Sequence, residues 1–212
     1  MEKISILLVD DHKLIRDSWS YILESDPRFR VIGSTGKADE ALAIAKAKHP
    51  KVVLMDLNMS PVNGFDLTKL IRKHLPDTKI IGVSMHSMPV YAKKMLQIGA
   101  MGYVTKNSSK EEMVAAILSV SGGEKYLCDE VKSILAKQEL DDNKPGMNDM
   151  NALTQREVDV VQLIKEGLSS RQIAEKLILS LKTVEVHRYN ILKKLKLKNT
   201  ATLVNFINAH GL

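Results

Sequence analysis

Short apolar runs alternate with longer amphipathic runs over the first 125 residues of the chain. The apolar runs predict five β-strands, at Ile4–Val9, Arg30–Gly33, Lys51–Met55, Lys79–Ser84 and Met101–Thr105. The amphipathic runs predict helices at 13–25, 38–48, 64–74, 88–98 and 109–121. Because alternating strands and helices form parallel sheets with helices on both faces, we expect an α/β fold with a doubly wound, five-stranded parallel sheet.

From about residue 152 onward the pattern is helical and contains no strand signal. Thr154 and Glu157 form a capping-box sequence ahead of one amphipathic run, and a serine precedes each of two further runs, at Ser169 and Ser180. We therefore expect a second, smaller, all-α domain. In its run from 181 to 195, one side is apolar, with Val184, Ile191 and Leu195, and the opposite side carries Lys182, Glu185, Val186, Tyr189 and Lys193.

Charge is unevenly distributed between these two parts. The net charge is +6, and the residues from Met150 to the end hold ten Lys and Arg against five Asp and Glu. The stretch between them is acidic and, at 141–146, rich in turn-forming residues. We therefore predict domains at 1–125 and 152–212, joined by a linker at 126–151. The basic second domain indicates a nucleic-acid partner, with an ordinary solvated surface as the alternative on charge alone.

The composition argues against several other classes of protein. No apolar run approaches the roughly 20 residues needed to span a bilayer, so we expect no membrane association. The single cysteine, Cys128, excludes an internal disulfide and a zinc site built from several cysteines, which fits a reducing cytoplasm. The six histidines show no ligand-like spacing.

Polar residues that can do chemistry stand at the ends of four predicted strands. They are Asp10 and Asp11 after the first strand, Asp56 after the third, Ser84 at the end of the fourth and Lys106 after the fifth. Because the carboxyl ends of parallel strands meet at one edge of a sheet, these side chains should share a pocket. Clustered carboxylates need a neutralising cation, and hard oxygen ligands suit Mg²⁺. A carboxylate beside that ion can attack a phosphoryl group while a lysine balances the charge of the transferred oxygens.

The first 120 or so residues resemble the receiver domain of bacterial two-component response regulators, which has a flavodoxin-like fold. The resemblance rests on Leu7–His12, Val53–Met59 with Gly64, Val83–Ser84 and Gly102–Lys106. It implies that Asp56 is the phosphoacceptor, and that Mg²⁺ is held by Asp11, Asp56 and the backbone carbonyl of Asn58, with Asp10 close by or acting through water. It also implies that Ser84 and Lys106 bind the phosphoryl oxygens and that Tyr103 turns inward when Ser84 moves. For Tyr103, a strand residue that simply packs on a helix is an equally weighted alternative.

Two departures from the family pattern lie beside this site. Proline is common four residues after the phosphoacceptor, where this chain has Ser60, with Pro61 next. Proline also often follows the lysine, where this chain has Asn107. Both changes touch loops around the pocket, so they bear on phosphoryl lifetime and switching kinetics, whereas we expect the chemistry to be retained.

The C-terminal part resembles the LuxR-type helix-turn-helix domain. The matching segments are Leu153–Glu157, Glu166–Ser169, Ile173–Ala174, Thr183–His187 and Asn190–Leu195. The resemblance makes 181–195 the recognition helix, with DNA contacts expected from Arg171, Lys182, Thr183, Glu185, Val186, Arg188, Tyr189, Lys193 and Lys194. It makes the last helix, about 200–209, the dimerisation surface, through Leu203, Val204 and Ile207. Without it, a solvated basic helix and a packing helix would explain the same patterns.

One position of the recognition helix departs from the family pattern. Glu185 stands where relatives often carry lysine. A glutamate repels phosphate and can accept a hydrogen bond from cytosine, whereas Val186 can contact a thymine methyl group. We therefore expect the base preference to differ from that of such relatives.

Together the two halves resemble the NarL/FixJ class of response regulators, which implies a transcription regulator and not an enzyme. The implied partners are a sensor histidine kinase that phosphorylates Asp56, double-stranded DNA, and a second copy of the chain in a homodimer formed on phosphorylation or DNA binding. One alternative is a DNA-binding regulator whose vestigial receiver works without phosphorylation. The other is a magnesium phosphohydrolase, but such enzymes generally show two aspartates separated by one residue, whereas Leu57 and Asn58 follow Asp56.

Overall fold

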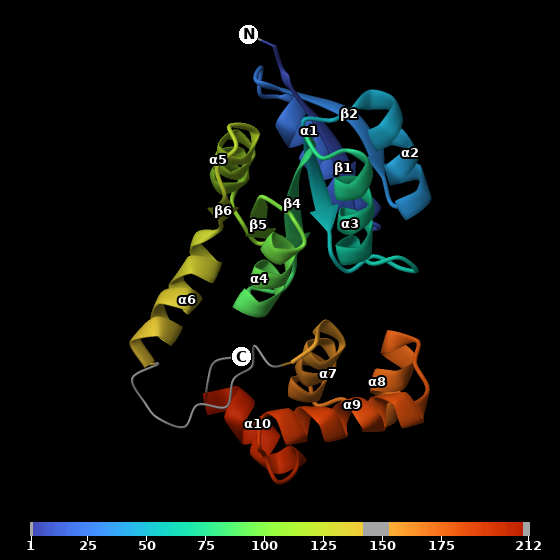
Figure 1. Cartoon of the computed structure of the whole chain (residues 1–212), viewed down its shortest axis with the longest axis vertical. Coiled ribbons are helices and arrows are strands. Elements are labelled where there is room, and N and C mark those ends of the chain that lie inside the picture. The colour runs from blue at the N-terminus through green and yellow to red at the C-terminus, as the bar shows by residue number, and fades with distance from the viewer. Residues whose placement is uncertain (1, 142–152, 210–212) are drawn as a thin grey trace. The chain divides into compact units, whose positions relative to one another are not determined.

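In the computed structural model, residues 2–141 and 153–209 are described, and the chain divides into two compact units, Met1–Gln138 and Glu139–Leu212 (Figure 1). The first unit combines a parallel sheet with helices, and the described part of the second unit is helical. None of the described helices is both long enough and apolar enough to cross a membrane.

Six parallel strands form the sheet, in the order β2-β1-β3-β4-β5-β6. They are β1 (Ile4–Val9), β2 (Phe29–Thr35), β3 (Val52–Asp56), β4 (Lys79–Ser84), β5 (Gly102–Thr105) and β6 (Tyr126–Leu127). The five predicted strands all form, within two residues of their expected bounds. The prediction of a five-stranded sheet is nevertheless wrong by one strand, because β6 has only two residues and shows no alternation that a pattern could detect.

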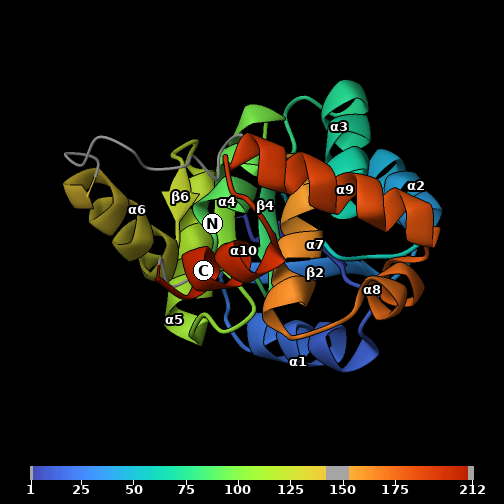
Figure 2. The same cartoon turned by 90° about the horizontal axis from the view of Figure 1, so that it is seen from below.

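Helices cover both faces of this sheet. They are α1 (Lys13–Glu24), α2 (Ala38–Lys48), α3 (Gly64–His74), α4 (Pro89–Gln97) and α5 (Lys110–Ser121). Figure 2 shows α1 and α5 on one face and α2 and α3 on the other. Phe65 of α3 stacks on Tyr91 of α4 with ring centroids 6.4 Å apart, so α4 adjoins α3. Side-chain caps fix two of the helix starts, since Asn63 accepts from the backbone of α3 and Ser109 from that of α5.

The central strands are largely apolar before their carboxyl ends because both of their faces are covered. Every residue of β3 is buried, and Ile80 and Ile81 of β4 are fully inaccessible. Such a platform leaves the carboxyl ends of the strands as the place where polar side chains emerge.

The segment 126–151, expected to be a linker, contains β6 and then helix α6 (Asp129–Asp141). The remainder of that expected linker, 142–151, lies outside the described residues, as do residue 152 and residues 210–212 of the expected second domain.

Four helices are described in the second unit: α7 (Gln155–Lys165), α8 (Ser170–Leu177), α9 (Leu181–Lys194) and α10 (Thr200–Ala209). The predicted capping box is present, because the Thr154 side chain and the Glu157 side chain each bond to the other's backbone N–H. Ser169 and Ser180 cap α8 and α9 as predicted. The predicted apolar side of the α9 region lies in the core of this unit, with Val184, Ile191 and Leu195 fully buried.

Candidate functional site

Asp56, the last residue of β3, lies at the carboxyl edge of the sheet and is only 1% exposed. Its Oδ1 accepts a hydrogen bond from the backbone N–H of Asn58, 3.1 Å away. Gly64 packs directly on its backbone, since a Cβ at position 64 would lie 2.0 Å from the carbonyl oxygen of Asp56. The loop between β3 and α3 is therefore closed tightly around this carboxylate.

Lys106 joins two of the expected acidic residues. Its Nζ lies 2.7 Å from Asp10 Oδ2 and 3.0 Å from Asp56 Oδ2. The Asp56 contact is an ion pair without good hydrogen-bond geometry, because Asp56 Oδ2 is buried and has no hydrogen-bond partner. The backbone N–H of Lys106 donates to the carbonyl oxygen of Ser84 at 2.7 Å, so the ends of β4 and β5 hold the lysine in place.

The balance of charge at this site is negative. Burial and then the nearby charge of Asp10 raise the pKa of Asp56 above its usual value, and Lys106 only partly opposes this. For Lys106, burial alone would lower the pKa, but the negative charges of Asp10 and Asp56 beside the ammonium group outweigh it and raise the pKa. The site therefore contains more buried carboxylate than one lysine neutralises.

A cation can be held at the exposed side of this cluster. Ligand atoms of Asp10, Asp11, His12 and Asp56 all lie within 4.8 Å of one another. Asp11 and His12 are exposed, whereas Asp10 and Asp56 are buried, so the set opens toward solvent on one side. Hard carboxylate oxygens, one of them without a hydrogen bond, fit a divalent cation such as Mg²⁺ that keeps several waters. Asn58 is exposed at the same loop, consistent with a ligand from its backbone.

His12 was not among the expected site residues. Its Nδ1 lies 2.8 Å from Asp11 Oδ1 and 3.2 Å from Asp10 Oδ1. Its position directly after the two aspartates could have indicated that it lies at the site. It was missed because a lone histidine without a spaced partner does not suggest a metal ligand.

The two expected switch residues are both fully buried. Ser84 and Tyr103 are 0% exposed, and the Tyr103 hydroxyl donates to the carbonyl oxygen of His86 at 2.5 Å. Burial raises the pKa of Tyr103 strongly. In this structure the Tyr103 ring is therefore already directed inward, over the loop that follows β4.

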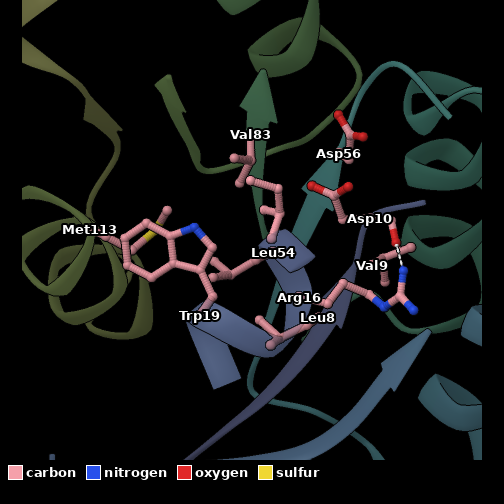
Figure 3. A pocket seen from close by; sticks show the side chains of 10 residues that line it. Leu8, Val9, Asp10, Arg16, Trp19, Leu54, Asp56, Val83 and Met113 are labelled. Atoms are coloured by element: carbon pink, nitrogen blue, oxygen red, sulfur yellow. Dashed lines mark hydrogen bonds between the residues drawn. The ribbon is translucent and has the colours of Figure 1, made fainter. Parts of the chain in front are cut away.

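Beside the acidic cluster lies a small pocket between α1 and α5 (Figure 3). Apolar side chains line most of it, among them Trp19 of α1 and Met113 of α5, and Asp10 and Asp56 lie at one end. Arg16 Nη1 donates to the backbone carbonyl of Asp10 at 2.6 Å, which fixes the loop between β1 and α1. Sequence reasoning missed Arg16, because an arginine in the second turn of a helix has no pattern that marks it.

The face of α9 opposite the core is exposed. Val186 is 50% and Tyr189 65% exposed, and the charged members of the expected set, Lys182, Glu185 and Lys193, are exposed as well. Arg171 of α8 is also exposed, with Glu175 as an ion-pair partner only at 4.0 Å. This face can meet a polyanion with cations at its edges and with apolar groups and one carboxylate at its centre.

Other residues expected at the DNA or dimer surfaces make contacts inside the second unit. Lys194 Nζ lies 2.7 Å from Glu157 Oε2, and Arg188 donates to Thr200 Oγ1 at 3.1 Å. The Thr183 hydroxyl lies 2.8 Å from that of Ser180, within the cap of α9. On α10 the expected dimer residues divide, with Val204 partly exposed while Leu203 and Ile207 are each 1% exposed and belong to the core.

Comparison with known families gives one match in each of two parts of the chain. Residues 6–118 match the family described as "Response regulator receiver domain", and residues 151–207 match "Bacterial regulatory proteins, luxR family". The chain is 36% identical over 210 residues to the "Transcriptional regulatory protein MctR" of Rhizobium johnstonii, which covers 99% of this chain and 95% of that protein.

Solved structures also match all or part of this chain. A two-component response regulator of the LuxR family from Aurantimonas sp. aligns with a TM-score of 0.63 at 29% identity, over 66% of this chain and 99% of that one. RcsB from Salmonella enterica serovar Typhimurium, solved bound to a promoter in the presence of phosphomimetic BeF3−, aligns with a TM-score of 0.61 at 24% identity, over 97% and 98% of the two chains. At 24% identity, the likeness to RcsB shows the fold alone.

Proposed function

Since the chain belongs to the bacterial response regulators that join a receiver domain to a LuxR-type DNA-binding domain, we propose that phosphorylation of Asp56 by a sensor histidine kinase controls its binding to DNA. Members of this family are transcription regulators and not enzymes. The observation that carries the proposal is the position of Lys106 Nζ, 2.7 Å from Asp10 and 3.0 Å from the buried Asp56. The proposed partners, a kinase and chromosomal DNA, imply a cytoplasmic protein.

In the proposed reaction, an Asp56 carboxylate oxygen forms a bond to phosphorus as the phosphorus–nitrogen bond of the kinase phosphohistidine breaks. The freed imidazole nitrogen keeps the electron pair of the broken bond. Lys106 pairs with the phosphoryl oxygens, and the Ser84 hydroxyl donates to one of them. Mg²⁺ held by Asp10, Asp11, Asp56 and the Asn58 carbonyl would supply positive charge that offsets the phosphoryl oxygens. The burial of Asp56 supports this role, because it keeps water away from the acyl phosphate.

Phosphorylation adds roughly −1.5 to −2 charges to a site that is already rich in negative charge. The added oxygens compete with Asp10 for Lys106 and offer Ser84 an acceptor. Ser84 is the last residue of β4, and Lys106 directly follows β5, the strand that contains Tyr103. The surface formed by β4 and β5 is therefore the part of the receiver that is proposed to change between two conformations. The buried position of Tyr103 supports its place in that element.

For DNA binding, we assign the exposed face of α9 to the major groove. Lys182 and Lys193, with Arg171 of α8, would contact phosphates, while Glu185, Val186 and Tyr189 would face the bases. Thr183 and Arg188 stay in the proposed surface at its edge. We assign Lys194 to its pair with Glu157 first and to phosphate only second, because the 2.7 Å contact already engages it.

We further propose that the DNA-bound or phosphorylated form is a homodimer, in which two recognition helices reach half-sites about one DNA turn apart. The exposed part of α10, which includes Val204, would contribute to the dimer contact. The RcsB structure with promoter DNA and a phosphoryl mimic is a precedent in a protein of the same fold.

The test is DNA binding by wild type, Asp56→Asn and a matched control, Asp77→Asn, which removes the same charge from an exposed position. Each is measured with and without beryllofluoride and Mg²⁺ across a salt series. We expect the mimic to tighten binding in wild type and Asp77→Asn only, with affinity that falls at about −0.9 per phosphate contact in a logarithmic salt plot. Equal binding by all three proteins, whatever the mimic, would favour the vestigial receiver instead.

A further inference from the structure

The first turn of α6 is attached to β5, the strand that carries Lys106 at its end. The strand β6, just before α6, pairs with β5 in parallel, with Gly102 opposite Tyr126 and Tyr103 opposite Leu127. The backbone N–H of Cys128 continues this ladder by donating to the carbonyl oxygen of Tyr103 at 3.0 Å. The start of α6 is thus held by the backbone of the strand that contains the proposed switch residue Tyr103.

A side-chain contact extends this attachment to the end of β5. The Thr105 hydroxyl donates to Glu130 Oε2 at 3.0 Å, across a sequence separation of 25 residues. Thr105 is only 1% exposed, so its hydroxyl needs a partner within the protein. Its other polar neighbour, Ser108 Oγ, is farther away at 3.4 Å, and a hydroxyl has a single proton to donate. Glu130 is therefore the principal acceptor for Thr105.

Thr105 occupies a central position among the proposed phosphoryl-binding residues. It precedes Lys106 in the chain and lies directly opposite Ser84 in the ladder between β4 and β5. A change in how Thr105 is held therefore reaches both the ammonium group and the hydroxyl that would bind phosphoryl oxygens.

Other contacts fix the same turn of α6 to the body of the receiver. The backbone N–H of Asp129 donates to Glu112 Oε1 of α5 at 2.7 Å, and Val131 is fully buried. Glu130 is the member of this turn whose side chain reaches β5 through a hydrogen bond. By contrast, the side chain of Asp129 is 83% exposed and pairs with Lys132 on its own helix.

We propose that Glu130 is a positioning residue of the phosphoryl site, which fixes Thr105, and through it Lys106 and Ser84, from the first turn of α6. This rests on the proposed function, since the ligand that it positions for is the phosphoryl group on Asp56. The hydrogen bond between Thr105 and Glu130 joins the phosphoryl site to the first turn of α6. Occupancy of the site and anchoring of α6 therefore stabilise each other, and the effect must hold in both directions. α6 is the helix by which the chain leaves the first unit.

The experiment compares full-length wild type with Glu130→Ala, Glu130→Gln, Thr105→Val, the Glu130→Ala/Thr105→Val double variant and Asp129→Ala. Asp129→Ala is the matched control, because it removes an acid from the same turn without touching Thr105. Affinity for beryllofluoride with Mg²⁺ is followed through the fluorescence of Trp19, the single tryptophan, which lines the pocket beside Asp10 and Asp56. Hydrogen exchange at the amides of 129–132 is measured with and without the mimic.

We expect Glu130→Ala and Thr105→Val each to weaken binding of the mimic about three- to tenfold, as the loss of one hydrogen bond gives. The double variant should be no weaker than either single one. Glu130→Gln keeps an acceptor oxygen and should restore most of the affinity, and Asp129→Ala should stay within about twofold of wild type. The mimic should slow exchange in the first turn of α6 in wild type but not in Glu130→Ala.

Each of three other outcomes would contradict part of the proposal. If wild type binds the mimic and Glu130→Ala matches Asp129→Ala in affinity and in exchange, Glu130 does not position the site while the proposed function stands. Additive losses in the double variant would show that the two side chains act separately. If wild type responds no better than Asp56→Asn, the proposed function fails, and the role of Glu130 fails with it.

Discussion

Both units of this protein bury a carboxylate against a lysine, and the two pairs have opposite consequences. In the receiver, Lys106 Nζ lies 2.7 Å from Asp10 and 3.0 Å from Asp56. In the helical unit, Lys194 Nζ lies 2.7 Å from Glu157, which is 2% exposed. The distances alone do not distinguish a functional pair from a structural one.

The difference lies in how many donors each carboxylate has. Glu157 Oε2 accepts bonds from the backbone N–H and the hydroxyl of Thr154, at 2.6 and 2.9 Å, in addition to Lys194. Burial would raise the pKa of Glu157, but these bonds outweigh it and hold the pKa below its usual value. Asp56 instead shares one lysine with Asp10, and its pKa is raised. A buried carboxylate with too few hydrogen-bond donors and counter-charges is therefore the feature that indicates a ligand-binding site, whereas an ion pair by itself does not.

Replacement of the lysine should give the largest difference in stability between the two pairs. Without bound cations, we expect Lys106→Met to lower the free energy of unfolding by about 4 kcal/mol, because it leaves two buried carboxylates without a counter-charge. Lys194→Met should cost about 2 kcal/mol, since Glu157 keeps its bonds to Thr154. Urea unfolding with a chelator present measures both. Addition of Mg²⁺ should restore part of the stability of Lys106→Met and none of that of Lys194→Met, and equal recovery would contradict the comparison.

Neutralisation of the structural carboxylate should destabilise the protein. We expect Glu157→Gln to lower the free energy of unfolding of the helical unit by about 2 kcal/mol, because Lys194 and the Thr154 cap lose an ionised acceptor. Thermal melting followed by far-ultraviolet circular dichroism measures this. Glu166→Gln, on the exposed surface of the same unit, is the control and should leave the melting curve nearly unchanged.

Neutralisation of Asp56 should have the opposite effect on stability. With a chelator present, Asp56→Asn should raise the free energy of unfolding of the receiver by roughly 1 kcal/mol, because it removes a charge that burial and Asp10 disfavour. The fluorescence of Trp19 reports unfolding of this unit specifically. A loss of stability in this variant would mean that Lys106 offsets the charge of Asp56 completely.

Through these two carboxylates, a fall in pH should lower the stability of the helical unit and raise that of the receiver. The pKa of Glu157 is lowered on folding, so its contribution to stability is complete above the model-peptide value of 4.5 and is lost as the pH falls through the folded pKa. The pKa of Asp56 is raised, so its ionised form costs stability at neutral pH, and that cost disappears as the pH falls through the folded pKa, above 3.8. Unfolding of wild type compared with Glu157→Gln and Asp56→Asn, between pH 7 and 3, should show differences that shrink in both cases.

An exposed pair should matter least. Lys176 and Glu166 lie 2.9 Å apart, closer than Lys106 and Asp56, but both side chains are more than half exposed. We expect Lys176→Met to change the free energy of unfolding by less than about 0.5 kcal/mol, because water and salt screen the pair. A larger change in urea unfolding would show that distance and not burial determines the strength of these pairs.

The position of the Lys106 pair in the receiver could be predicted from the sequence, whereas that of the Lys194 pair in the helical unit could not. Parallel strands end at one edge, so Asp10, Asp56 and Lys106 had to converge once the strands were recognised. Lys194 was predicted to contact DNA because it stands on the predicted recognition helix. Its contact with Glu157, 37 residues away, depends on how α7 packs against α9, which no periodicity encodes.

The attachment of α6 to β5 was beyond sequence reasoning for a similar reason. Two residues of strand, Tyr126 and Leu127, give no alternation, and the surrounding acidic residues favoured a linker. The bond between Thr105 and Glu130 depends on that short strand, because β6 places the start of α6 beside the end of β5. Short elements that are set by pairing and not by pattern are where such predictions fail.

Cys128, between β6 and α6, makes the chain convenient for spectroscopy. It is the only cysteine, it is fully buried, and burial raises the pKa of its thiol. A shielded, protonated thiol reacts slowly with maleimide dyes and spin labels. Pairs of surface cysteines, one introduced in the receiver and one in the helical unit, can therefore be labelled in an otherwise native background. Distance distributions between the labels would then follow the two units from the free protein to the DNA complex.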